Sequence, residues 1–107
     1  MAELNRSSNS KGHASEFYLA CREGDLMKVN RLLKTMHIRE VNQIEDSNNS
    51  TALHAASFFG HANVVKALLE VGANIHTHNG HGLRPEQEAH TQEIKDLFKQ
   101  HKKKNQS

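Results

Sequence analysis

The chain repeats a pattern of small and apolar residues at intervals of 33 to 36 positions. One set of residues recurs 36 positions later; the pairs are Ala20 and Ala56, Gly24 and Gly60, Leu32 and Leu68, Leu33 and Leu69. At an offset of 33 positions, Asn49, Thr51, Ala52 and Ala56 map onto Gly82, Arg84, Pro85 and Ala89. Repeats of this length cannot each bury an apolar face alone, so neighbouring units must stack. The sequence predicts three stacked units over residues 15–45, 46–78 and 79–101.

Each unit is expected to hold two antiparallel helices, which makes the fold class all-α. In the middle unit, Thr51 is placed to cap a first helix over residues 52–59, which Gly60 ends. A second helix is predicted over residues 62–70, with Gly72 as its C-terminal stop. Its buried stripe is Val64, Val65, Leu68 and Leu69. Asp25 and Thr91 are predicted to cap the corresponding second helices of the outer units.

The middle unit resembles the ankyrin-repeat family. Its segment 51–56 reads TALHAA, which matches the family signature T-P-L-H-x-A except that Ala52 stands in the proline position. The resemblance implies a solenoid of helix-turn-helix units with short turn fingers, which binds another protein as an adaptor or regulatory module. It also implies structural, hydrogen-bonding roles for His54 and His61 and a tightly packed small residue at positions 20, 56 and 89.

Composition limits the other function classes. The chain has 107 residues, 36% of them apolar, and a net charge of +2, which suits one domain. It contains no apolar run long enough to cross a bilayer and no signal-peptide pattern, so we expect a cytoplasmic or nuclear monomer that binds neither membrane nor nucleic acid. It also lacks phosphate-loop, nucleophile-elbow and metal-triad motifs. The prediction is therefore a non-enzyme without cofactor.

The outer units depart from the middle one. The first unit leaves its second helix through a longer stretch, residues 34–42, where we expect a non-standard loop. The third unit is about four residues short at its central turn, and its exposed positions are polar, as required of a C-terminal cap. Residues 1–14 are rich in Ser, Asn and Gly, and residues 102–107 are polar and basic, so both ends are predicted to be disordered.

The resemblance also assigns partner-binding positions. In ankyrin proteins these are the turn tips and the two residues at the exposed end of each first helix. On the first helices the matching residues are Phe58, Phe59, Arg22 and Glu23, and at the turn tips they are Ser47, Asn48, Ser50, His78, Gly80, His81 and Leu83. Phe58 and Phe59 are about 100° apart on a helix, so at least one is expected to be exposed. The alternative is that they pack beneath the turns or against the loop after residue 34.

Two further features have plain structural readings. Cys21 aligns with Ser57 in a small slot between helices, which favours an inert packed thiol over a catalytic one. The run of His76, His78 and His81 could offer imidazoles to zinc, but no cysteine or carboxylate cluster completes a four-ligand set. We therefore predict no metal site, with a weak pH response as the better alternative.

A targeting domain at the N-terminus of a larger enzyme or signalling protein remains the runner-up function.

Overall fold

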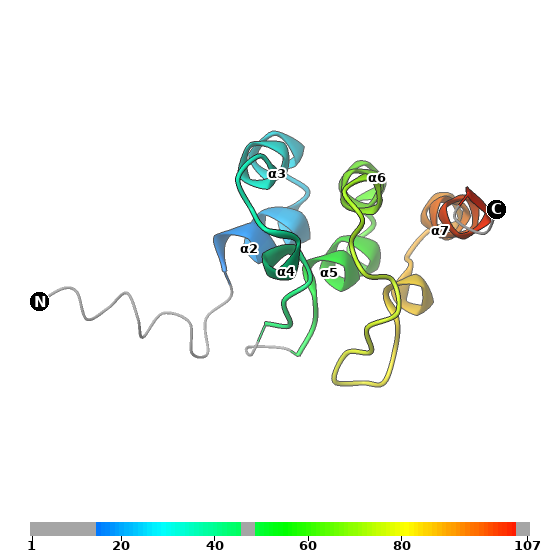
Figure 1. Ribbon diagram of the computed structural model, residues 1–107. Helices are drawn as coiled ribbons and strands as arrows, with labels where there is room; N and C mark the ends of the chain where they lie inside the picture. Colours follow the sequence, from blue (N-terminus) through cyan, green and yellow to red (C-terminus); the bar gives the residue numbers. More distant parts are fainter. Residues whose placement is uncertain (1–14, 46–48, 105–107) are drawn as a thin grey trace, which may run out of the picture.

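The computed structural model describes residues 15–45 and 49–104 and shows two rows of helices (Figure 1). The first row holds α2 (Glu16–Glu23), α5 (Ala52–Phe58) and the 3-10 helix η1 (Pro85–Glu88), and the second holds α3 (Leu26–Leu33), α6 (Ala62–Glu70) and α7 (Gln92–Lys104). A short helix, α4 (Ile38–Val41), lies between the first two pairs in the sequence. The connections after α4 and α6 descend as turn fingers on the first-row side. The described residues therefore form an all-α stack of helix pairs.

Local caps explain where the helices begin and end. Ser15, Asp25 and Thr51 each accept a hydrogen bond from a backbone amide of the first turn that follows. The Thr91 hydroxyl does the same for the amide of Ile94 at the start of α7. Gly24, Gly60 and Gly72 have φ of 77°, 79° and 88°, the left-handed conformation that terminates a helix with little strain in glycine. Helix α6 spans the range expected from the sequence.

The core lies between the two rows and between neighbouring helix pairs. Ala20 and Ala56 are buried in the first row, as the close approach of α2 and α5 requires. The predicted stripe of α6 is buried, and from α7 the side chains of Ile94 and Phe98 are fully covered. The stack is held together by nearest-neighbour packing, which is the behaviour expected of a solenoid.

The exit from the first unit is a helix where we expected an irregular loop. The His37 imidazole accepts a hydrogen bond from the amide of Arg39, and the Glu40 carboxylate accepts one from the amide of His37. This reciprocal cap stabilises four residues of α4, and Val41 anchors them by being buried. The expectation of a non-standard loop was wrong for residues 38–41 because a single capped turn leaves too short a periodic signal to detect.

The third unit has only one full α-helix. Its first element is the 3-10 turn η1, so the expectation of two helices in every unit was wrong here. The third unit is about four residues shorter than the middle unit at this point, which leaves room for only one short helical turn. Pro85 occupies the first position of that turn, where proline is well tolerated. Ala89 consequently becomes the residue that ends η1 and is partly buried, whereas Ala20 and Ala56 lie fully packed inside helices.

The basic end of the chain is helical as far as Lys104. The expectation of a disordered tail was therefore wrong for residues 102–104, which continue α7. Lys102 forms an ion pair with Glu86 of η1, and cations in the last turn of a helix interact favourably with its dipole. Residues 1–14 and 105–107, also predicted to be disordered, lie outside the described residues. Among the described helices, none has the length and apolar character needed to cross a bilayer.

Candidate protein-binding face

Phe58 and Phe59 stand at the exposed end of α5. Phe58 is 53% exposed and Phe59 is 52% exposed, so both rings reach solvent, more than the single exposed ring that the sequence required. The two ring centroids are 5.0 Å apart with an interplanar angle of 88°, an edge-to-face arrangement. Such a contact is worth about 0.5–1.5 kcal/mol beyond the area that it buries. We refer to Phe58 and Phe59 as the aromatic pair.

The aromatic pair borders a pocket of about 220 Å³ on the side of the first-row helices and fingers. We call it the concave pocket; its lining residues are Tyr18, Ser50, His54, Ala55, Phe58, Phe59, His81 and Glu88. It thus gathers four of the predicted binding residues, and it draws side chains from all three units. Sequence reasoning missed Tyr18, His54, Ala55 and Glu88 as lining residues. Tyr18 and His54 occupy equivalent positions at the 36-residue offset, but the sequence analysis gave His54 only a structural role.

The other predicted residues that the structure describes do not line this pocket. Arg22 is half-buried and Glu23 is exposed at the end of α2, and the Arg22 carbonyl accepts a hydrogen bond from His61 Nε2 at 2.8 Å. His78 is exposed and Leu83 is partly buried in the second finger. Ser47 and Asn48 lie outside the described residues, so the tip of the first finger is placed only through Ser50 and its neighbour Asn49.

The second finger is a tight turn organised by Asn79. Its Oδ1 accepts hydrogen bonds from the amides of His81 at 2.9 Å and Leu83 at 3.1 Å, and the turn continues through Gly82 at positive φ. The amide of Gly80 donates to the carbonyl of Asn49 at 2.9 Å, which joins the two fingers directly. The described parts of the two fingers are therefore joined by backbone hydrogen bonding, and the second finger is also braced by Asn79.

His54 connects α5 to the second finger. Its Nε2 lies 2.7 Å from the carbonyl oxygen of Leu83, which can only accept, so Nε2 carries the proton. Its Nδ1 lies 2.7 Å from Thr51 Oγ1 and accepts the hydroxyl proton. The side chain is fully buried, and burial lowers the pKa of His54 below 6.5, against opposing effects of the Leu83 carbonyl and Glu88. These contacts support the structural role that the family pattern implied, and His61 is held in a comparable way by the Arg22 carbonyl.

The lowered pKa of His54 predicts a loss of stability in mild acid. Since the folded pKa lies below the unfolded value, the unfolded chain binds the extra proton first. The contribution of His54 is therefore complete above the unfolded pKa of about 6.5 and declines as the pH falls below it. Urea denaturation at a series of pH values should show a steeper loss of unfolding free energy for the natural chain than for a His54→Gln variant. Equal slopes would contradict this prediction, because the other eight histidines are common to both proteins.

The other candidates for a reactive or metal-binding role are Cys21 and the histidines at positions 76, 78 and 81. Cys21 is fully buried, and desolvation raises the pKa of its thiol to about 12, which keeps it protonated and supports the packing role. His76, His78 and His81 are all exposed. Within residues 15–45 and 49–104, no three His, Cys, Asp or Glu side chains come together in a way that could hold a metal ion.

Comparisons with known proteins agree with this architecture. A family model described as ankyrin repeats, in three copies, matches residues 4–79. The human histone-lysine N-methyltransferase EHMT1 is 36% identical over 66 residues, which is 61% of this chain but 5% of that protein. The NF-kappa-B inhibitor alpha of Sus scrofa is 34% identical over 61 residues, covering 54% of this chain and 19% of the inhibitor. The chain thus spans only a small part of either relative.

The family match covers most of the chain, and its span of residues 4–79 holds the TALHAA segment and the helix pairs α2–α3 and α5–α6, whereas η1 and α7 lie beyond it. Ankyrin repeats are protein-interaction modules and are typically not catalytic. The chain belongs to the ankyrin-repeat family.

Proposed function

We propose that this chain is a non-enzymatic adaptor or regulatory module that binds a partner protein through the finger tips and the concave pocket. The observation that carries the proposal is the aromatic pair, two rings that are half exposed and held edge to face beside a pocket. Aromatic anchors surrounded by polar residues are the usual composition of an interface hot spot. Ser50, His81 and Glu88 supply such a polar rim here.

The size of the concave pocket indicates what enters it. At about 220 Å³ it is smaller than the cavities of roughly 300–1,000 Å³ that hold drug-sized ligands. It therefore suits one side chain of a partner, while the finger tips contact the surrounding surface. Aromatic side chains also have few rotatable bonds, so they lose little conformational entropy on binding, which favours affinity.

The relatives support two versions of this proposal. The inhibitor of NF-kappa-B is named for its action on another protein, which favours a regulatory module. EHMT1 is named as a methyltransferase, and this chain matches only 5% of it, which favours the second candidate, a targeting domain at the N-terminus of a larger enzyme or signalling protein. An antibody raised against residues 15–104 would separate them, because an immunoblot shows whether the natural protein is much larger than 12.1 kDa.

A Phe58→Ala/Phe59→Ala variant is expected to lose its partner and keep its fold. Truncating true hot-spot residues costs at least about 2 kcal/mol of binding, a loss of roughly 30-fold in affinity. Because both rings are already half exposed, their removal should lower the unfolding free energy far less than truncating a core phenylalanine would. Affinity capture from lysate, followed by calorimetric titration of the captured protein, measures the change after circular dichroism has verified helical folding.

The matched control is Met27→Ala/Val71→Ala. Met27 is 84% exposed and Val71 is 44% exposed, and neither lines the concave pocket, so this variant removes two large apolar side chains elsewhere. It should retain the partner. If the two variants lose affinity equally, or if neither loses it, the aromatic pair is not the interface.

The absence of nucleic-acid binding, the monomeric state and the cytoplasmic or nuclear location remain expectations from the sequence. The alternative of a metal site at His76 to His81 has no clustered ligands to support it within the described residues.

A further inference from the structure

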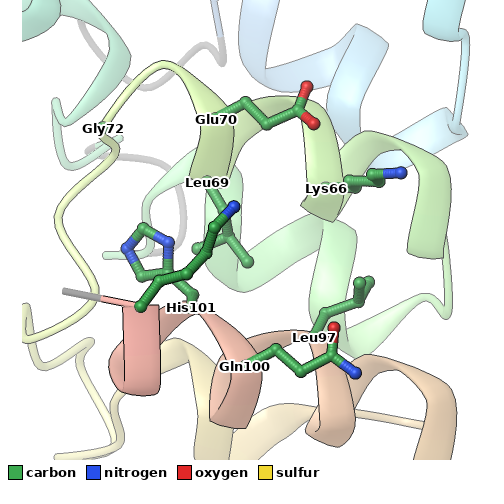
Figure 2. A pocket seen from close by; sticks show the side chains of 8 residues that line it. Lys66, Leu69, Glu70, Gly72, Leu97, Gln100 and His101 are labelled. Atoms are coloured by element: carbon green, nitrogen blue, oxygen red, sulfur yellow. The ribbon is translucent and has the colours of Figure 1, made fainter. Parts of the chain in front are cut away.

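A second, larger depression lies between the helices of the other row. It has a volume of about 390 Å³ and runs between α6 and α7 (Figure 2). We call it the rear groove; its lining residues are Lys66, Leu69, Glu70, Gly72, Leu97, Gln100, His101 and Lys104. None of these residues lines the concave pocket, and neither the family signature nor the proposed function makes use of them.

The rear groove has an apolar floor. Leu69 of α6 and Leu97 of α7 lie between the two helices in Figure 2. On α7 the lining positions 97, 100, 101 and 104 follow the i, i+3, i+4, i+7 spacing of a single helical face, and on α6 positions 66, 69 and 70 follow i, i+3, i+4. Two helical faces thus meet across an open seam, and apolar surface at its base is available to one side chain of a ligand.

The rim of the rear groove is mainly basic. Lys66 comes from α6 and Lys104 from the last turn of α7, so each helix contributes one lysine to the lining, and Glu70 contributes its single carboxylate. Neither lysine has a salt bridge among the described residues, whereas Lys102 is paired with Glu86. The dipole of α7 accounts for basic residues at its own C-terminus. It does not account for Lys66, which lies in the middle of α6.

The groove is open at the end marked by Gly72. A Cβ atom built at Gly72 would meet no other atom within 4 Å, which leaves space beside the turn after α6. A peptide can therefore extend past this end and is not confined to a closed cavity. The volume also exceeds that of the concave pocket, so it accommodates more than one side chain.

We propose that the rear groove binds an acidic peptide segment of a partner protein, with one large apolar side chain against Leu69 and Leu97 and flanking carboxylates at Lys66 and Lys104. Charge complementarity selects the ligand, since two ammonium groups outnumber one carboxylate on the rim. The apolar floor favours this ligand over a purely anionic polymer. Such a polymer has no apolar group to cover Leu97, which would stay in contact with water. This site shares no lining residue with the concave pocket.

The test is a fluorescence-anisotropy titration with a labelled peptide that carries a central Leu flanked by Glu and Asp. The natural chain should bind it, and a Lys66→Gln/Lys104→Gln variant should bind it about tenfold more weakly, which corresponds to the loss of roughly 1.4 kcal/mol. The matched control is Lys95→Gln/Lys99→Gln, which removes the same charge from exposed positions of α7 that do not line the groove. That control should bind as the natural chain does.

Four further measurements test which groups of the peptide are recognised and where on the chain it binds. Replacing the peptide's Leu by Ser should abolish binding, and raising the ionic strength from about 0.01 M to about 1 M should weaken it, because the Debye length falls from roughly 30 Å to 3 Å. Amide NMR signals of Gly72, Leu97 and Gln100 should shift on titration. The Phe58→Ala/Phe59→Ala variant should bind the peptide normally, which keeps failure of this site distinct from failure of the concave pocket.

Several outcomes would overturn the proposal. One is equal loss of affinity in the groove variant and its control, since that would reflect net charge alone. Another is equal binding of the Leu and Ser peptides or of a single-stranded oligonucleotide, which would show a general anion surface with no use for Leu69 and Leu97. Unshifted signals of Gly72, Leu97 and Gln100 in the presence of bound peptide would place the site elsewhere, and absence of binding by the natural chain would refute it directly.

Discussion

Replacing Phe98 by alanine should lower the free energy of unfolding by about 3–5 kcal/mol, the usual cost of truncating a buried phenylalanine. The side chain is fully covered in α7, where it joins the last helix to the core of the stack. Since small domains have a total stability of only about 5–15 kcal/mol, this loss removes a large part of it. Urea denaturation followed by circular dichroism measures the change.

The control for this prediction is the same substitution at a half-exposed site. Phe58→Ala removes an identical set of atoms from a ring that is 53% exposed, so it should cost much less. Equal destabilisation by the two substitutions would show that α7 does not depend on Phe98 for its attachment. A larger effect of Phe98→Ala would identify α7 as a cap whose core residue supports the units behind it.

Gly24→Ala should destabilise the chain by about 2–4 kcal/mol through two separate effects. Gly24 has a φ of 77°, which is unfavourable for any residue with a Cβ. In addition, the new Cβ would lie 2.5 Å from Nδ1 of His61, so the imidazole must move and lose its 2.8 Å contact with the Arg22 carbonyl. The junction between the first two units would therefore be weakened. Thermal and urea denaturation report the combined loss.

A second glycine separates the two effects. Gly72 has a φ of 88°, but a Cβ there would meet nothing within 4 Å, so Gly72→Ala should cost only the conformational part, about 1–2 kcal/mol. A double-mutant cycle between Gly24→Ala and His61→Ala isolates the steric part. If His61→Ala does not reduce the cost of Gly24→Ala, then the close approach of these residues carries no energetic weight.

Local signals explain why part of this fold could be predicted from the sequence. Helix α6 was predicted to the residue because Gly60 before it, Gly72 after it and a regular apolar stripe all act within a few positions of the chain. The caps Asp25, Thr51 and Thr91 follow from the same short-range chemistry. At least one ring of the aromatic pair was expected to be exposed because adjacent side chains project about 100° apart on a helix, and both rings are exposed.

The missed features depend on contacts between distant parts of the chain. The Glu45 carboxylate accepts hydrogen bonds from both the amide and the hydroxyl of Ser15, 30 residues earlier, and no local pattern announces that link. The ion pair of Lys102 with Glu86, which accompanies the helical tail, spans 16 residues. The concave pocket likewise combines Tyr18 with Glu88, so its lining could be assembled only once the stacking of the units was known. Tertiary packing decides such details, and propensity does not.

The concave pocket takes side chains from all three units, so its shape is coupled to the bending of the stack. Its width depends on how sharply the stack bends at each of the two junctions. A side chain that filled it would bridge the terminal units across the middle one and oppose fraying at both ends. Occupancy would then be visible as slower amide hydrogen exchange in α2 and α7, far from the point of contact. Conversely, a substitution on the opposite row that altered the bend would change affinity without touching the ligand.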